Sequence, residues 1–155
     1  KVAGHRGQQV AEARGIVAID NSKATNPHAA DSALAGHDSV IWVAGGQLKG
    51  AEVDDLVARH AHRLKAVALM GVDRNIIRES VEKHAPGVPI FVTDDTDPQS
   101  AMDAVCAWAV TQASSGDAIV LAPAAASLDM YTGMGQRGVL FAESVSAHLG
   151  GVAPK

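Results

Sequence analysis

Short apolar runs alternate with segments of helical pattern along this 155-residue chain, and the alternation restricts the folds that it can adopt. The apolar runs predict strands at 10–13, 16–19, 40–44, 66–70, 90–92 and 118–121. The segments between and after them predict helices at 27–36, 54–63, 74–84, 98–113 and 137–149. Strands that are separated by single helices cannot pair as hairpins, so they form a parallel sheet with right-handed crossovers. The alternation therefore predicts an α/β fold.

The start of the chain adds two local signals to this pattern. The first two apolar runs flank Arg14-Gly15 and predict a short β-hairpin. Asn26 suits a helix N-cap and Pro27 suits the first helical position, so the first helix begins there. The continuous apolar run at 40–44 is typical of a strand that is covered on both faces. We expect a Rossmann-like, mostly parallel sheet with helices on both faces and a leading hairpin.

Length, charge and cysteine content limit the class of protein. The chain is long enough to bury a core without disulfides or metal. A net charge of −4 argues against a nucleic-acid partner, which requires a basic face. No apolar run could span a bilayer, and no apolar signal-peptide region follows Lys1. The single cysteine, Cys106, excludes an internal disulfide and is predicted to be a buried core side chain. We expect a cytoplasmic protein without membrane insertion.

The chain begins at Lys1 without an initiator methionine. We therefore expect it to be an excised or processed part of a longer protein. No internal repeat or linker divides it, so the chain itself is predicted to form one domain.

Three loops follow the carboxyl ends of predicted strands, which is where parallel α/β sheets bind ligands. In the first, at 21–27, Lys23 and Thr25 lie just before the positive end of a helix. An ammonium, a hydroxyl and free backbone N–H groups suit an anion. A plain helix N-cap with a solvated lysine fits the same residues equally well, so both interpretations stay open.

The other two loops, at 45–50 and 123–131, carry glycines, alanines and a few polar side chains. In the second loop, a glycine pair would let a ligand approach the backbone, and Lys49 would supply a charge. A simple strand-to-helix turn is equally consistent with these residues. The loop is not a Walker A motif, because it lacks the GxxxxGK[ST] pattern. In the third, Ser127 is placed to bind a carboxylate. It lacks the glycines of a serine-hydrolase elbow, which excludes that function.

Two further patterns suggest cofactors but fit poorly. Residues 133–138 spell GxGxxG, yet they do not join a strand directly to a helix, as a dinucleotide-binding motif does. His60 and His62 lie two positions apart on a predicted helix and so point apart. We expect the seven histidines to be solvated or partly packed, without a bound metal.

Taken together and in this order, the three loops resemble the C-terminal domain of the Mur ligases. The segments that carry the resemblance are Ser22-Lys23-Ala24-Thr25-Asn26, Gly45-Gly46-x-x-Lys49-Gly50 and Ala126-Ser127-Leu128-Asp129, followed by Gln136-Arg137-Gly138 and Phe141. The similarity extends from His5 to about Leu149. Segment 22–26 is the most specific, and it resembles the branch of the family that adds D-glutamate. The resemblance implies that 1–155 is an amino-acid-binding domain, with a UDP-binding and a central ATPase domain outside the sequence.

The resemblance also implies roles for individual residues. The residues that would hold the two carboxylates of D-glutamate are Thr25, Lys49 and Ser127, with backbone near Leu128. The residues that would lie on the nucleotide side are Arg6, Asn21 and Lys23. The family usually has an aspartate at the position of Asn21, where it is expected to touch the nucleotide ribose.

The family's reaction consumes ATP in peptidoglycan precursor synthesis, and so in cell-wall formation, cell shape and division. The carboxylate of UDP-N-acetylmuramoyl-L-alanine is phosphorylated, and the amine of D-glutamate attacks it to form an amide. The P-loop and the Mg²⁺ ions belong to the central domain, so we expect no catalytic residue here and no activity from this domain alone. Two alternatives remain: a related ligase domain for another amino acid, such as a folylpolyglutamate type, or a non-catalytic Rossmann-like module that binds a small anion.

Overall fold

Six strands of the computed structural model, which describes residues 7–150, form one sheet in the order β1-β2-β6-β3-β4-β5. The strands are β1 (Gln8–Ala13), β2 (Ile16–Asp20), β3 (Val40–Gly45), β4 (Leu64–Met70), β5 (Ile90–Val92) and β6 (Ala118–Leu121). The helices are α1 (Pro27–Ala35), α2 (Asp54–His60), η1 (Ala61–Arg63, a 3-10 turn), α3 (Arg74–His84), α4 (Pro98–Gln112) and α5 (Met134–His148). Each strand and helix that the sequence predicts is therefore present.

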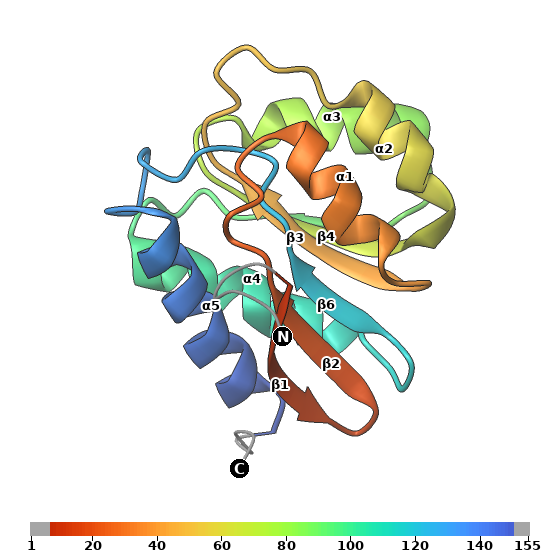
Figure 1. Cartoon of the computed structure of the whole chain (residues 1–155), viewed down its shortest axis with the longest axis vertical. Helices are drawn as coiled ribbons and strands as arrows, with labels where there is room; N and C mark the ends of the chain where they lie inside the picture. The colour runs from red at the N-terminus through yellow and green to blue at the C-terminus, as the bar shows by residue number, and fades with distance from the viewer. Residues whose placement is uncertain (1–6, 151–155) are drawn as a thin grey trace.

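Every neighbouring pair of strands is parallel except β1 and β2, which form the predicted hairpin (Figure 1). Ala13 and Ile16 pair on either side of the hairpin turn. The last strand in sequence, β6, lies between β2 and β3 and pairs with both along its whole length. The expected mostly parallel sheet with a leading hairpin is confirmed.

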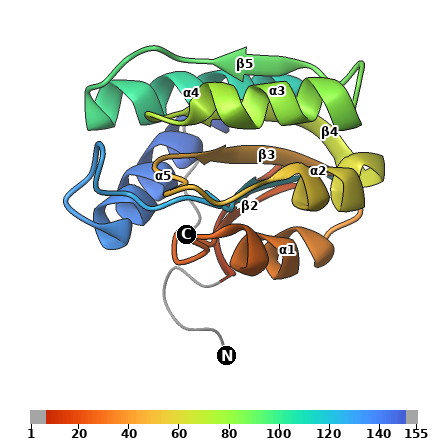
Figure 2. The same cartoon turned by 90° about the horizontal axis from the view of Figure 1, so that it is seen from above.

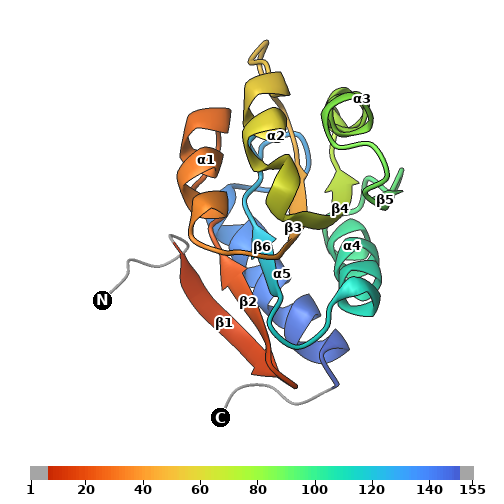
Figure 3. The same ribbon diagram turned by 90° about the vertical axis from the view of Figure 1, so that its right-hand side faces the viewer.

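Helices cover both faces of this sheet (Figures 2 and 3). α1, α2 and α3 pack on one face, and α4 and α5 pack on the other. Because side chains alternate across a strand, Trp42 lies in the core between the sheet and α1, α2 and α3. Ile41 and Val43 lie in the core between the sheet and α4 and α5. Trp42 is fully buried, and its indole N–H donates to the carbonyl of Ala122 at 2.7 Å. The continuous apolar run of β3 is thus explained by burial on both sides.

Two helix ends differ from the predicted ones by three residues, and the others agree to within one. α5 begins at Met134 instead of 137, although Gly135 lowers helix propensity in its first turn. A tertiary contact compensates, since the Ser22 hydroxyl donates a hydrogen bond to the Met134 carbonyl. α2 ends at His60, where the chain tightens into η1 and leads directly into β4.

Candidate functional site

Five loops leave the carboxyl ends of the parallel strands at one edge of the sheet. They are the β2–α1 loop (21–26), the β3–α2 loop (46–53), the β4–α3 loop (71–73), the β5–α4 loop (93–97) and the β6–α5 loop (122–133). The first, second and fifth contain the residues that the sequence singles out, and the third and fourth do not.

Backbone hydrogen bonds connect the three predicted loops. Gln47 and Ala126 each donate an N–H to the other's carbonyl, at 2.9 and 2.8 Å. The N–H of Ala124 donates to the carbonyl of Ala24 at 2.9 Å. Ala124 is buried at φ 60, a left-handed conformation that costs energy in a residue other than glycine. The β6–α5 loop therefore lies between the other two and is bonded to both.

The glycine pair Gly45 and Gly46 serves a different purpose from the one expected. A Cβ on Gly45 would lie 1.8 Å from the carbonyl oxygen of Met70, and one on Gly46 would lie 2.2 Å from that of Ala126. Both glycines have positive φ, 127° and 138°. The sequence predicts that a ligand could approach the backbone here, but the space is filled by the protein's own chain. The pair allows β3, β4 and the β6–α5 loop to meet.

The residues expected to bind the amino acid lie on these connected loops with different exposure. Lys49 is exposed and has a left-handed backbone, with φ 54. Thr25 is half-buried, Ser127 is 5% exposed and Leu128 is 66% exposed. The carbonyl of Ser127 accepts the N–H of Tyr131 at 2.8 Å, which closes a turn around Leu128. The loops thus present an ammonium, hydroxyls and an apolar side chain at one edge.

Two of the three residues expected on the nucleotide side line a surface cavity of about 340 Å³. Asn21 and Lys23 contribute to its wall, with Ala29 and Ser32 of α1. The backbone N–H of Asn21 donates to the Leu121 carbonyl at 2.9 Å, which anchors the loop to β6. Arg6 lies outside the described residues.

The N-terminus of α1 adds a positive dipole beside this cavity. The side chain of Asn26 accepts the N–H of Ala29 at 2.9 Å, and Pro27 occupies the first turn. The predicted N-cap is confirmed. Whether Lys23 and Thr25 also bind an anion stays a prediction.

Arg137 is a site residue to which the sequence assigned no role. Its side chain is fully buried, and it donates to the carbonyls of Ser22 and Gly45 at 3.1 and 3.4 Å. Burial lowers the pKa of Arg137 to about 10, while the nearby Tyr131, Asp129 and Asp20 act in the opposite direction. One guanidinium thus bonds to the β2–α1 loop and to the end of β3. Arginine is rarely buried, so only its place in the resemblance marked it.

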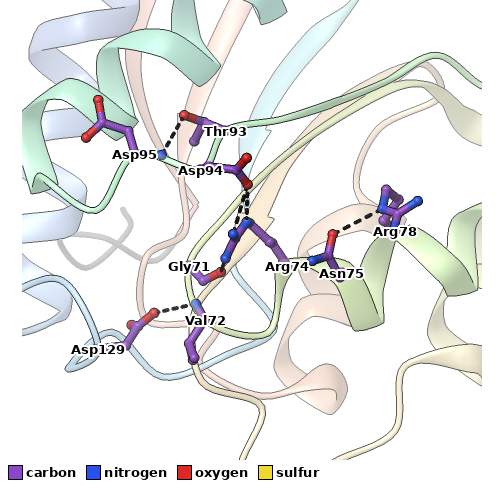
Figure 4. A network of polar contacts seen from close by, with 9 residues as sticks. All are labelled: Gly71, Val72, Arg74, Asn75, Arg78, Thr93, Asp94, Asp95 and Asp129. Carbon is purple, nitrogen blue, oxygen red and sulfur yellow. Dashed lines mark hydrogen bonds and ion pairs between the residues drawn. The ribbon is translucent and has the colours of Figure 1, made fainter.

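The β4–α3 loop is the second feature that the sequence did not identify (Figure 4). The Val72 N–H donates to the carboxylate of Asp129 at 2.9 Å, which attaches this loop to the β6–α5 loop. Arg74 donates to Asp94 at 2.8 and 3.1 Å and to the Gly71 carbonyl at 2.9 Å. A cavity of about 290 Å³ is lined by Val72, Arg74 and Asp129, together with Gln47 and Thr96.

The remaining cofactor patterns take structural positions. Gly133 is the N-cap of α5, and residues 134–138 form its first turn, so the GxGxxG segment is the start of a helix. His60 is 2% exposed rather than solvated, because its ring bonds to Asp31 at 2.6 Å and accepts from Arg63 at 3.0 Å. Within residues 7–150, no group of three or more His, Cys, Asp or Glu side chains could hold a metal ion.

Cys106 is fully buried as predicted, and burial raises the pKa of its thiol. A thiol in this environment stays protonated and packs as an apolar group. Among the helices that the structure describes, none is long and apolar enough to cross a membrane.

Known proteins are similar to this chain in both sequence and fold. Residues 5–125 match the family described as Mur ligase, glutamate ligase domain. The UDP-N-acetylmuramoylalanine--D-glutamate ligase of Corynebacterium diphtheriae is 68% identical over 149 residues, which are 96% of this chain and 31% of that protein. The protein of the same name from Corynebacterium efficiens is 59% identical over 155 residues, 100% of this chain and 33% of that protein.

A solved murein peptide ligase from Psychrobacter arcticus has the same fold, with a TM-score of 0.63 and 17% identity over 97% of this chain and 31% of its own. The chain spans about a third of the length of these relatives. The match to the family covers most of the chain and includes the β2–α1 and β3–α2 loops. This chain therefore belongs to the Mur ligase family and comprises its C-terminal, glutamate ligase domain.

Proposed function

We propose that this chain is the D-glutamate-binding part of an ATP-dependent ligase that adds D-glutamate to UDP-N-acetylmuramoyl-L-alanine in the cytoplasm. The observation that carries the proposal is the 68% identity to a ligase named for that reaction, over 96% of the chain. The convergence of three loops at one edge of the sheet supports it, because parallel sheets bind ligands there.

D-Glutamate carries two carboxylates and one amine, and the site offers groups suited to the carboxylates. Lys49 supplies a positive charge, and Thr25 and Ser127 supply hydroxyl donors. The backbone at Leu128 lies in the turn closed by the Ser127 carbonyl. Hydrogen bonds from charged donors to carboxylates are among the strongest in proteins. We assign these four residues to amino-acid binding, with the amine left free for reaction.

The role of the chain in the reaction is to hold and orient. Fixing a nucleophile in the right geometry removes much of the entropic barrier to amide formation. ATP would supply the phosphoryl group that activates the precursor carboxylate. Lys23, Asn21 and Arg6 are assigned to the nucleotide side, and the cavity beside the N-terminus of α1 fits an anionic group.

Magnesium fits this part of the protein less well. The described residues offer no cluster of carboxylates or histidines that could ligate it. We therefore assign no Mg²⁺ ligand to residues 7–150 and derive no step from the metal.

Turnover by the full-length enzyme tests the proposal. Initial rates with D-glutamate and with L-glutamate identify the amino acid that is added, and rates with folate-linked glutamate test the alternative acceptor. We expect turnover with D-glutamate only. Lys49→Ala and Ser127→Ala should each raise KM for D-glutamate by about tenfold or more, because each removes a hydrogen-bond donor to a carboxylate of the ligand. KM for ATP should stay near wild type. Preference for another amino acid would point to the folylpolyglutamate type, and absence of any turnover would point to a binding module.

A further inference from the structure

Helix α3 begins after Asp73, yet the side chain of this aspartate makes no hydrogen bond with its own helix. The N-caps of α1 and α4 behave differently. Asn26 accepts the N–H of Ala29, and Asp97 accepts that of Ser100. A side-chain cap stabilises a helix, so an aspartate that leaves its helix uncapped indicates that its carboxylate is used elsewhere.

The carboxylate of Asp73 instead bonds to the β3–α2 loop. Its Oδ2 accepts the backbone N–H of Leu48 at 2.7 Å. The backbone N–H of Asp73 donates to the carbonyl of Gly46 at 3.0 Å. Gly71 makes this approach possible, because a Cβ on it would lie 2.5 Å from the nitrogen of Gly46. Asp73 thus holds the β3–α2 loop at two points.

The segment held in this way ends next to Lys49. Leu48 is 5% exposed, and its carbonyl accepts the N–H of Ala51 at 3.0 Å, so its peptide groups are bonded on both sides. Lys49 itself is exposed and has φ 54, a conformation that a lysine rarely adopts without support. The residue before Lys49 is thus held on both sides, which supports that backbone.

We propose that Asp73 is a positioning residue that orients Lys49 for the carboxylate of the amino acid. The inference rests on the proposed function, since it assumes that Lys49 binds D-glutamate. A carboxylate is a stronger acceptor than a neutral oxygen, and Asp73 uses it to fix the backbone N–H of Leu48, the residue before Lys49. When that bond is absent, Lys49 is free to leave its left-handed conformation and the binding site loses its preformed geometry.

Asp73→Ser in the full-length ligase tests this role without sacrificing the fold. Serine suits an N-cap as well as aspartate does, and Asp73 makes no side-chain cap bond that α3 could lose. Its hydroxyl is one atom closer to the backbone than the carboxylate oxygen, so it does not reach Leu48. The matched control is Asp97→Ser, the same substitution at the N-cap of α4, where the aspartate caps its own helix.

We expect Asp73→Ser to raise KM for D-glutamate by about tenfold, the loss typical of one charge-assisted contact. KM for ATP, kcat and the unfolding midpoint should stay near wild type, and Asp97→Ser should change none of them. In the double variant with Lys49→Ala, the effects should not add, because Asp73 acts through Lys49.

Two results would overturn the proposal. One is an unchanged KM for D-glutamate in Asp73→Ser, and the other is full additivity with Lys49→Ala. A general structural role would instead raise all KM values together and lower the unfolding midpoint. Failure of the proposed function is distinguishable, because the wild-type enzyme would then fail to use D-glutamate before any variant is tested.

Discussion

Replacing Gly45 with alanine tests the close meeting of β3 and β4 at the site. The new Cβ would lie 1.8 Å from the carbonyl oxygen of Met70, its partner in the β3–β4 pairing, and this is backbone that cannot rotate away. The strands must separate by roughly 1 Å, and such overpacking costs about 2 kcal/mol. The φ of 127° costs about 2 kcal/mol more in a residue with a Cβ. We expect Gly45→Ala to lower the free energy of unfolding by about 4 kcal/mol.

Urea denaturation measures this change, and the fluorescence of the buried Trp42 is a suitable signal. With a slope of about 2 kcal/mol per molar urea, the midpoint should fall by about 2 M. Gly36→Ala is the matched control. Gly36 has φ −76, and a Cβ there would meet nothing closer than the Ala33 carbonyl oxygen at 3.9 Å. This substitution should leave stability unchanged or raise it by about 0.5 kcal/mol.

The two variants must differ for the structural explanation to stand. If Gly45→Ala unfolds at the same urea concentration as Gly36→Ala, the close approach of residue 45 to the Met70 carbonyl is refuted. A shift in midpoint with an unchanged slope would show that stability changed and the unfolded state did not.

Two further substitutions test buried charges. Arg137→Lys should lower the free energy of unfolding by about 2 kcal/mol in urea denaturation, because one ammonium cannot replace a fork that reaches both the Ser22 and the Gly45 carbonyls. An unchanged midpoint would contradict the proposed link. Asp117→Asn should reduce the loss of stability in acid, measured as the urea midpoint between pH 7 and pH 3. Burial raises the pKa of Asp117, but hydrogen bonds from Lys65, Ser114 and Ser39 outweigh it and lower the pKa below 3.8. The stabilisation is therefore present above about pH 4 and is lost as pH falls through the folded-state pKa. An equal acid loss in Asp117→Asn would exclude this carboxylate as its cause.

Local signals in the sequence were sufficient to predict the elements of the fold. α3, β5 and β6 have the predicted bounds, because their apolar spacing and flanking residues are local properties. The start of α1 was predicted from Asn26-Pro27 for the same reason. The predicted start of α5 was wrong by three residues, because a hydrogen bond from Ser22, which is distant in sequence, supports the first turn of the helix.

The candidate site was predicted less completely, because its supporting contacts are made between distant segments. Asp73 and Leu48 lie 25 positions apart, and Arg137 lies 115 positions from Ser22. No periodicity or short motif records such pairs. The glycine pair was correctly expected to allow close approach, but the partner is the Met70 backbone and not a ligand. The roles of Thr25, Lys49, Ser127 and Leu128 in binding stay predictions.

The central place of β6 has a consequence for the order in which the molecule can be built. During translation, the β1–β2 hairpin and the β3–β4–β5 group leave the ribosome before β6, the strand that joins them. Until then each group has an open strand edge, which other chains can pair with. The β2–α1 and β3–α2 loops belong to different groups, so they take up a common orientation only when residues 118–121 are inserted. Under the proposed function, the amino-acid site therefore cannot form before residues 118–121 have been synthesised and inserted into the sheet.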